Sequence, residues 1–345
     1  MQILDAPATA LALPWMPLVA ALERTLADAA VGRVQAPERW VLPVAPGTSW
    51  FLMPAWLAHD AGDLAAIKLI TYASANPARG LPSILGDVLV LRASTGERLA
   101  LLDGPTVTAR RTAAVTLLAA LRLAPAPIGL PGPGSTVAGP LLVIGTGVQA
   151  LAHVQALVAG AGVREVWVRG RTPARSRAFV QALQAQAGTA SLPVPDLQIA
   201  PADDLDTALQ RCRWIVTATP AAAVCLHGAV RPDAFVAAVG AFSPAMIELD
   251  PALTRQLAAD GRVVLDSAAA RHEAGDLLTA GLDLAGLPTL AELLAGVQAE
   301  LRAGVPAVPA DPAAPALPRP AGPVLFKSCG ASLWDLAAAR CAVGA

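Results

Sequence analysis

A buried strand runs into a glycine turn and a helix at residues 141–157, LLVIGTGVQALAHVQAL, and this pattern leaves few folds open. Four aliphatic residues precede Gly145-Thr146-Gly147, and the apolar residues that follow recur at helical spacing. A strand, a tight glycine turn and a helix in this order are typical of a parallel α/β sheet. The segment therefore predicts a helix whose N-terminus is able to hold a phosphate group.

The same alternation of short apolar strands and helices continues beyond this segment. Further strands are predicted at 165–170, 213–219, 234–242 and 262–267, and helices at 148–160 and 173–186. Pro173 stands in the first turn of the second helix, where proline is favoured. This order predicts a parallel sheet that is covered by helices on both faces.

The chain before residue 124 has a different, mixed pattern. A helix is predicted at 17–32, strands at 50–56 and 65–73, a hairpin at 87–104 around Thr95-Gly96, and a helix at 108–124. A connector rich in proline and glycine follows at 124–140 and predicts a domain boundary. A proline- and alanine-rich run at 305–323 predicts an extended surface loop, and residues 324–343 predict a strand, a turn and a helix.

Composition excludes several classes of protein. The 345 residues exceed what one compact core usually holds, which favours two domains. A formal net charge of -1 with 15% charged residues provides no basic field for nucleic acid. Prolines and glycines interrupt the charge-free region 123–163, and the N-terminus lacks the pattern of a secretory signal, so we expect a soluble, cytoplasmic protein with no membrane partner. The four cysteines form no CxxC pair, and neither a metal site nor a disulfide framework is predicted.

The glycine turn matches the GxGxx(G/A) pattern of dinucleotide sites. Gly145 allows the sharp turn, Gly147 lets backbone N–H groups approach a pyrophosphate, and Ala150 occupies the third position. An ordinary strand-to-helix turn is the alternative interpretation. Because the motif lies within a βαβ unit, the sequence favours dinucleotide binding.

The end of the next strand bears on which dinucleotide is bound. NAD sites generally place an acid there to accept the ribose hydroxyls. This chain has Arg169, Arg171 and Thr172 instead, and arginine pairs well with a 2′-phosphate. The prediction is NADPH in preference to NADH, with NADH as a second cofactor that the site could accept. Arg175 and Arg177 are interpreted as solvated surface residues.

Unusual cations lie outside the nucleotide unit. Arg39 precedes an apolar strand, Lys68 lies within one, Arg111 opens a helix, and Lys327 is near the C-terminus beside Ser328 and Asp335. A cation in an apolar strand is costly unless it has an anionic partner. For Lys68 that partner is either a ligand carboxylate or an internal Asp, and the residues alone favour the internal pair.

These segments together resemble the ornithine cyclodeaminase/mu-crystallin family along nearly the whole chain. The resemblance is carried by Lys68 in its strand and by the motifs LDG…TARRTAA, GTGVQA, TATP, VGAFSPAMIEL, VLDS…HEAGD and FKSCG. It implies a homodimer of α/β chains, in which a Rossmann-type parallel-sheet domain, residues 125–323, is inserted into an α+β substrate-binding and dimerisation domain, residues 1–124 plus 324–345.

The resemblance also assigns site residues. It implies that Arg39, Lys68 and Arg111 face the carboxylate of a small amino or imino acid and that Lys327 closes the cofactor side. The candidate cofactor-binding residues, from the motifs and the resemblance together, are Arg111, Thr112, Gly145, Thr146, Gly147, Val148, Gln149, Arg169, Arg171, Thr172, Thr217, Ala218, Thr219 and Lys327.

One departure from the family pattern bears on the reaction. Related cyclodeaminases carry an Asp shortly after the glycine of the VG strand, whereas here Gly240 is followed by no acid until Glu248. Without that carboxylate, redox-neutral deamination loses a principal base, and net hydride transfer remains. The segments VGAF, KLITYASANPARGLPS and FKSCGASLWDLAAAR look most like those of Δ1-pyrroline-2-carboxylate reductases, which implies reduction of a small cyclic imino acid to L-proline or L-pipecolate.

Several alternatives remain open. An alanine dehydrogenase-like activity and the cyclodeaminase reaction are the nearest rivals within the family. A noncatalytic protein of mu-crystallin type, which binds NADPH and a small ligand, is a rival of another class. Lys68 either anchors the substrate carboxylate, which we favour, or assists proton delivery to the imine nitrogen.

Overall fold

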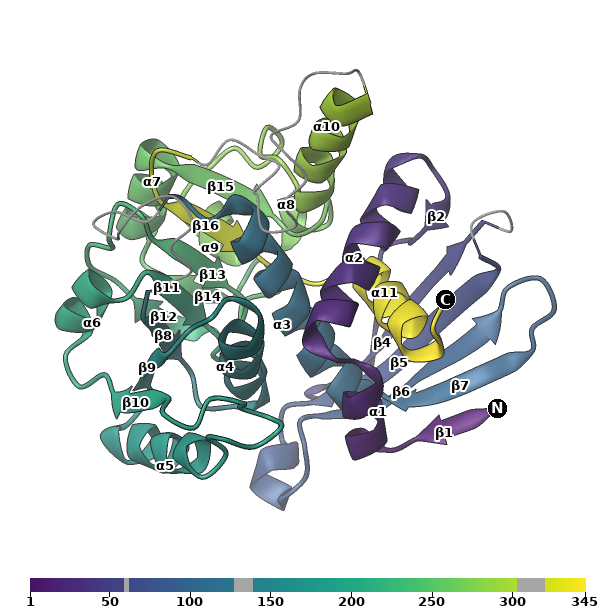
Figure 1. Ribbon diagram of the computed structural model, residues 1–345, viewed down its shortest axis with the longest axis horizontal. Coiled ribbons are helices and arrows are strands. Elements are labelled where there is room, and N and C mark those ends of the chain that lie inside the picture. Colours follow the sequence, from purple (N-terminus) through teal and green to yellow (C-terminus); the bar gives the residue numbers. More distant parts are fainter. Residues whose placement is uncertain (59–61, 127–138, 303–319) are drawn as a thin grey trace. The chain divides into compact units, whose positions relative to one another are not determined.

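The computed structural model describes residues 1–58, 62–126, 139–302 and 320–345. The chain divides into two compact units, the first Met1–Val115 with Gly330–Ala345 and the second Thr116–Cys329 (Figure 1). Most of the predicted connector at 124–140 and of the predicted loop at 305–323 lies outside the described residues.

The first unit is built on a largely antiparallel sheet. Its elements are β1 (Gln2–Leu4), α1 (Ala6–Ala12), α2 (Trp15–Ala30), β2 (Val34–Gln35), β3 (Trp40–Ala45), β4 (Thr48–Leu57), β5 (Leu64–Ala73), the 3-10 helix η2 (Asn76–Arg79), β6 (Ile84–Arg92), β7 (Arg98–Asp103), the start of α3 (Gly104–Leu123) and α11 (Ser332–Val343). The strand order is β1-β7-β6-β5-β4-β2, with β3 paired to β4. The predicted hairpin is confirmed, since β6 and β7 pair antiparallel and Gly96 takes the positive φ of the turn, 72°.

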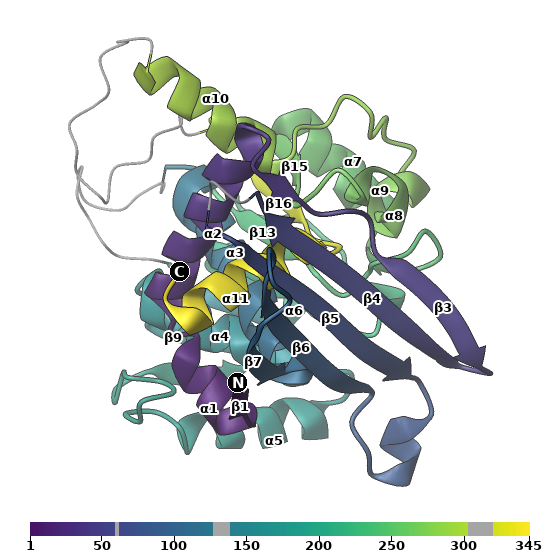
Figure 2. The same ribbon diagram turned by 90° about the vertical axis from the view of Figure 1, so that its right-hand side faces the viewer.

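Side chains alternate between the two faces of this sheet, and helices cover one of them. Met53, Lys68 and Val88 are cross-strand partners on β4, β5 and β6 and are all buried. The C-terminal helix α11 packs on this face and against α2 (Figure 2). A segment more than two hundred residues away in sequence therefore completes the core of the first unit.

A helix that crosses a membrane needs roughly 20 consecutive, mostly apolar residues. Among the described residues, no single helix is both long and apolar enough to cross a bilayer. The bent pair α1 and α2 meets the length and composition criteria only when both helices are counted together. Leu18, Leu22 and Leu26 of α2 are buried in the core of the first unit.

The second unit is built on a parallel sheet. Its elements are the end of α3, β8 (Leu141–Ile144), α4 (Val148–Gly160), β9 (Glu165–Arg169), α5 (Pro173–Gln184), β10 (Gln198–Pro201), α6 (Leu205–Arg211), β11 (Trp214–Thr217), β12 (Ala222–Leu226), β13 (Phe235–Ala238), β14 (Ile247–Leu249), α7 (Pro251–Asp260), β15 (Arg262–Leu265), α8 (Ala270–Glu273), α9 (Gly275–Thr279), α10 (Leu290–Arg302) and β16 (Val324–Lys327). The main sheet has the order β10-β9-β8-β11-β13-β16-β15, and all its pairs are parallel. The predicted α/β class with a parallel sheet is confirmed.

The position of β16 differs from the predicted domain boundary. The boundary at 323/324 assigned this strand to the substrate-binding domain, but β16 pairs with both β13 and β15 inside the parallel sheet. Val324, Leu325 and Phe326 are fully buried there. The second unit accordingly extends to Cys329, and the chain enters the first unit at Gly330. The other predicted boundary, at 124/125, falls after α3, whereas the units meet within that helix.

Candidate functional site

Two predicted cations of the first unit converge on one buried carboxylate. The Lys68 ammonium on β5 lies 2.9 Å from each oxygen of Asp335, which is in the first turn of α11. The Nε of Arg111 on α3 lies 3.2 Å from Oδ1 of the same residue. Lys68 and Asp335 are fully buried and Arg111 is 5% exposed. The internal Asp weighed as the partner of Lys68 is thus present.

Local sequence explains how these groups meet. The alternation of β5 places Lys68 on the covered face of the sheet, beneath α11. Asp335 lies in the first turn of α11, where the helix dipole stabilises a carboxylate. Gly330 has a φ of 86°, and a Cβ there would lie 3.0 Å from Nη1 of Arg111. Glycine at this position therefore leaves room for the guanidinium.

Burial changes the acid–base behaviour of Lys68. Its pKa is lowered to about 7, chiefly because burial disfavours the charged form and secondly because Arg111 repels it. Asp335 acts in the opposite direction, and Arg39 adds a smaller repulsion. An ammonium with such a pKa is able to hold or release a proton near neutral pH.

Arg39 and Thr112 are the other predicted site residues of this unit, and their surroundings differ. Arg39 is half-buried, and its guanidinium lies 5.8 Å from the centre of the Phe51 ring. Its charge is near enough to Lys68 to lower the pKa of that residue. The Thr112 hydroxyl instead donates to the backbone oxygen of Thr108 at 2.7 Å, within its own helix.

The glycine turn of the second unit has the geometry of an anion site. Gly145 has a φ of 130°, and a Cβ there would collide with the backbone oxygen of Ala218. Gly147 is the N-cap of α4, whereas α5, α6 and α7 of this unit begin with the side-chain caps Thr172, Asp204 and Asp250. Val148 and Gln149 form the first turn of α4, and a helix N-terminus without a capping side chain is suited to bind an anion.

The residues after β9 are arranged around the start of α5. Arg169 donates from Nη1 to the backbone oxygens of Ala202 and Asp203, at 3.1 and 3.3 Å. Arg171 is exposed, and the Thr172 hydroxyl caps α5 by accepting from the N–H of Arg175. Of the two predicted arginines, Arg171 is the more accessible to a ligand.

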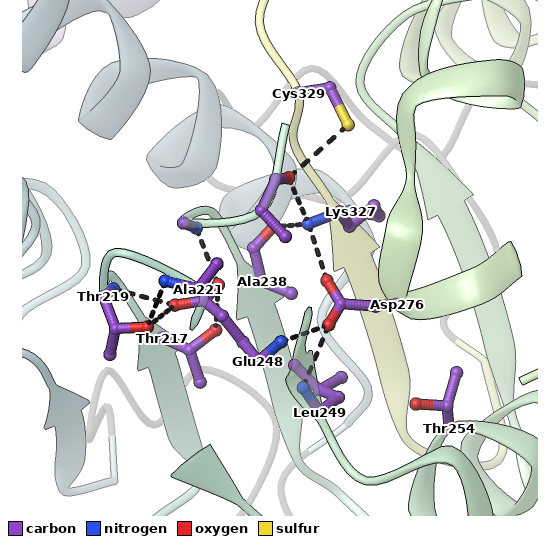
Figure 3. Close-up of polar contacts among 12 residues, drawn as sticks. Thr217, Thr219, Ala221, Ala238, Glu248, Leu249, Thr254, Asp276, Lys327 and Cys329 are labelled. Atoms are coloured by element: carbon purple, nitrogen blue, oxygen red, sulfur yellow. Dashed lines mark hydrogen bonds and ion pairs between the residues drawn. The ribbon is translucent and has the colours of Figure 1, made fainter. Parts of the chain in front are cut away.

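The predicted threonines lie at the end of β11 and just after it, and both contact a buried carboxylate. The hydroxyls of Thr217 and Thr219 donate to the Glu248 carboxylate at 2.9 and 2.8 Å (Figure 3). The backbone N–H groups of Thr219 and Gly240 also donate to it, each at 2.7 Å. Glu248 is fully buried, and both of its oxygens accept two hydrogen bonds.

Lys327 is held in the same polar network. Its ammonium lies 2.8 Å from Oδ2 of Asp276 and donates to the backbone oxygen of Ala241 at 2.6 Å (Figure 3). The side chain is fully buried. This geometry gives Lys327 a role in holding the segment after β13, rather than an exposed position against a ligand.

Sequence reasoning did not assign a site role to Asp335, Glu248, Asp276 or Gly330. Asp335 stood in a quoted motif, but nothing local paired it with Lys68, 267 residues away. Glu248 was noted only as the next acid after Gly240. The available signal was an acid within an otherwise apolar run, IEL, because a buried carboxylate needs several donors.

Comparisons with known proteins agree with this architecture. The Δ1-pyrroline-2-carboxylate/Δ1-piperideine-2-carboxylate reductase of Azospirillum brasilense is 37% identical over 340 residues, 99% of this chain and 94% of that protein. The Δ1-pyrroline-2-carboxylate reductase 1 of Burkholderia multivorans is also 37% identical, with the same coverage. The solved Δ1-pyrroline-2-carboxylate reductase of Thermococcus litoralis, in complex with NADH and L-proline, matches 100% of this chain and 97% of its own with a TM-score of 0.81. At 22% identity, that likeness shows a shared fold.

The family itself follows from the extent of these matches. The model of the ornithine cyclodeaminase/mu-crystallin family matches residues 9–302. This range includes Lys68 and Arg111 of the first unit and the glycine turn of the second. The chain belongs to the ornithine cyclodeaminase/mu-crystallin family.

Proposed function

We propose that this chain is an NAD(P)H-dependent ketimine reductase. It reduces Δ1-pyrroline-2-carboxylate to L-proline and accepts the six-membered Δ1-piperideine-2-carboxylate, which gives L-pipecolate. One relative named for both activities and another named for the first of them are each 37% identical to this chain over 99% of its length. The observation that carries the proposal is the cation cluster of the first unit, in which Lys68 and Arg111 share the single carboxylate of Asp335.

The cluster suits a substrate with one carboxylate next to a C=N bond. Lys68 and Arg111 both contact the carboxylate of Asp335, and Arg39 lies near enough to lower the pKa of Lys68. When Lys68 is protonated, these positively charged side chains favour the binding of a second carboxylate. Arg111 and Arg39 would bind the substrate carboxylate, and Lys68 would complete the positive field while it is protonated. Fixing the substrate in one orientation can remove about 7–11 kcal/mol of an activation barrier at best.

The second unit provides the features that a nicotinamide dinucleotide needs. Gly145 makes the tight turn after β8, where a side chain would collide with the backbone oxygen of Ala218. Gly147 begins α4 without a capping side chain, so the N-terminus of this helix can bind a pyrophosphate. A reduced nicotinamide bound there would supply the hydride for the carbon of the protonated imine. The residues of the chain orient the imine and hold its carboxylate.

The cofactor is proposed to be NADPH in preference to NADH. The exposed Arg171 lies just before the N-terminus of α5, where both a cation and helix N–H groups favour a 2′-phosphate. Comparing kcat/KM for the two cofactors tests this point. Arg171→Ala should lower the preference for NADPH, whereas Arg177→Ala, an exposed arginine of the same helix, should leave it unchanged.

The surroundings of Gly240 favour reduction over cyclodeamination. Glu248, the first acid after this glycine, already accepts four hydrogen bonds and is fully buried. It is therefore not available as a base for the amine of ornithine. Incubation with ornithine and measurement of released ammonia should give no product.

A substrate panel tests the proposed reaction. Purified protein with Δ1-pyrroline-2-carboxylate and NADPH should consume the reduced nicotinamide and yield L-proline. Pyruvate with ammonia tests the alanine dehydrogenase alternative, and NADPH binding without turnover of any of these substrates would indicate a ligand-binding protein. Consumption of NADPH with pyruvate and ammonia alone would contradict the proposal.

We also propose that two copies associate through the open face of the first sheet. The exposed residues of β3 to β6 include Trp40, Leu42, Trp50, Trp56, Ile67, Leu69 and Leu85. Trp40 is 63% exposed and Trp50 is 44% exposed. Register places Leu42 opposite Trp50, so these side chains lie on one face, the one opposite Lys68. A contiguous apolar surface of this kind marks an interface between proteins.

A further inference from the structure

The buried carboxylate of Glu248 joins two segments that follow neighbouring strands of the parallel sheet. Oε1 accepts from the N–H and the hydroxyl of Thr219, after β11, and Oε2 accepts from the hydroxyl of Thr217 and the N–H of Gly240, after β13 (Figure 3). We propose that Glu248 is a positioning residue that sets the spacing of these two segments and so shapes the surface that receives the nicotinamide half of the cofactor. The inference rests on the proposed function.

Topology indicates which half of a dinucleotide these segments would meet. In a doubly wound sheet, ligands bind at the carboxyl ends of the strands, and the pyrophosphate sits at the first glycine turn. Here that turn follows β8, and the candidate adenosine residues follow β9, on one side of β8. The strands on the other side are β11 and then β13. The nicotinamide half would therefore lie against the segments after β11 and β13, which Glu248 joins.

Each of these two segments directs a backbone N–H group at Glu248, so both carboxylate oxygens are needed as hydrogen-bond acceptors. The N–H groups of Thr219 and Gly240 both point at the carboxylate, one at each oxygen. A buried N–H group without an acceptor is costly, so one side chain satisfies a backbone donor of each segment. Gly240 is needed because a Cβ there would collide with both Glu248 and the backbone oxygen of Thr219.

Glu248 is itself fixed by a second buried acid. Oδ1 of Asp276 accepts the N–H groups of Glu248 and Leu249, at 2.6 and 2.9 Å. Its other oxygen pairs with Lys327, which also donates to the backbone oxygen of Ala241 beside Gly240. The contacts therefore run from β14 to β16 and back to the segment after β13 (Figure 3). Neither oxygen of Glu248 is left for proton transfer, which separates this role from that of a catalytic acid or base.

The experiment compares two ligands that share the adenine half. Glu248→Gln keeps the volume of the side chain but turns one acceptor into a donor, which faces an N–H group. The Kd of NADPH should rise about tenfold or more, because the nicotinamide half loses its ordered surface. The Kd of adenosine 2′,5′-bisphosphate, which lacks the nicotinamide and its ribose, should change by less than about twofold. Isothermal titration calorimetry measures both.

A matched control separates this effect from general destabilisation. Asp233 is also a fully buried carboxylate of the second unit, but it precedes β13 and pairs with Arg231 at 2.8 Å, at the other end of the strand. Asp233→Asn should lower the unfolding temperature without a selective loss of NADPH binding. If Glu248→Gln does not fold, Thr219→Val removes one of the four donors at similar volume and should weaken NADPH binding about threefold, again without affecting the bisphosphate.

The outcomes separate this inference from the proposed function. Equal weakening of both ligands in the Glu248 variant, or unchanged binding of both, would overturn the positioning role while the wild type still binds NADPH. If Thr219→Val stands in, the same two results would overturn it as well. A wild-type protein that binds neither ligand would overturn the proposed function and this inference with it.

Discussion

The surroundings of Lys68 lower the pKa of its ammonium group. It lies within a strand, is fully buried, and has Asp335 within 2.9 Å and the guanidinium of Arg111 on the same carboxylate. Burial and Arg111 together outweigh the attraction of Asp335, and its pKa is lowered to about 7. A substrate carboxylate in this position would raise that pKa again, because binding and protonation reinforce each other.

This coupling predicts how carboxylate binding depends on pH. Because the charged form of Lys68 is lost as pH rises through about 7, affinity for a carboxylate ligand should be constant below that pH and fall above it. Pyrrole-2-carboxylate is a suitable probe, since its ring nitrogen does not titrate in this range. The inhibition constant measured from pH 5.5 to 9 should rise by up to tenfold per pH unit above roughly 7. A flat profile in the wild type, or an unchanged profile in Lys68→Met, would contradict the anchoring role.

Asp335 should set where that pH profile bends. Asp335→Asn removes the attraction that holds the pKa of Lys68 up, while burial and Arg111 continue to lower it. The bend in the binding profile should therefore move to lower pH. Removing one partner of a buried pair also costs about 3–5 kcal/mol of stability, so urea denaturation identifies the conditions under which the variant is folded. A folded variant whose bend stays in place would show that Asp335 does not control Lys68.

The candidate site was only partly predictable from the sequence, for a physical reason. Lys68 stands out because a cation in an apolar strand requires compensation, and Gly145 because a turn of its φ excludes other residues. Asp335 carries no such local mark, and the apolar run around Glu248 indicates that this acid is buried but not which groups donate to it. Their roles depend on donors brought to them by tertiary folding, such as Gly240 for Glu248. The arginine predictions depend on ligand contacts and stay predictions.

At the level of helices and strands, α4 begins at the glycine turn and is hydrogen-bonded through His153 to the C-terminal half of α3. His153 of α4 is fully buried, with Nδ1 2.7 Å from the backbone oxygen of Gln149 and Nε2 3.0 Å from the Thr116 hydroxyl on α3. Burial lowers the pKa of His153 to about 4, although the hydrogen bond to Gln149 opposes the shift. The neutral ring is therefore part of the packed link between the two helices.

That link predicts an acid-sensitive contribution to stability. The pKa of His153 is lower in the folded than in the unfolded chain, so its contribution is complete above about pH 6.5 and is lost as pH falls through about 4. The shift corresponds to about 3 kcal/mol at most. The unfolding free energy of wild type should fall more between pH 6.5 and 4 than that of His153→Gln. His227→Gln, at an exposed histidine of the same unit, should behave as wild type, and parallel curves for all three would exclude the linkage.

The elements themselves were largely predictable, but their neighbours in a sheet were not. The alternation of strands and helices predicted the parallel sheet, and the Thr95-Gly96 turn predicted the hairpin. The strand β16 was also expected, yet its place between β13 and β15 depends on pairing with residues far away in the chain. Apolar strands of four residues, such as β13 and β16, carry no local signal for such partners.

For the complete protein, the open face of the first sheet is the feature that calls for a partner. Size-exclusion chromatography with light scattering should give twice the mass of the 35.0-kDa chain at micromolar concentration. Trp50→Glu places a charge on the exposed apolar face and should yield monomers. Leu11→Glu is the control, because Leu11 is 82% exposed on α1 of the same unit and away from this face. A monomeric wild type would refute the association.

The identity of the anion-binding group is tested by removing the carboxylate from the substrate and Arg111 from the protein in one set of measurements. Steady-state kcat/KM with NADPH is determined for Δ1-pyrroline-2-carboxylate and for Δ1-pyrroline, with wild type and with Arg111→Met. The prediction is a loss of about a hundredfold on the carboxylate substrate, roughly 3 kcal/mol, and a change of less than about threefold on Δ1-pyrroline. An equal loss on both substrates, or no loss on either, would contradict the assignment of these buried cations to the substrate carboxylate.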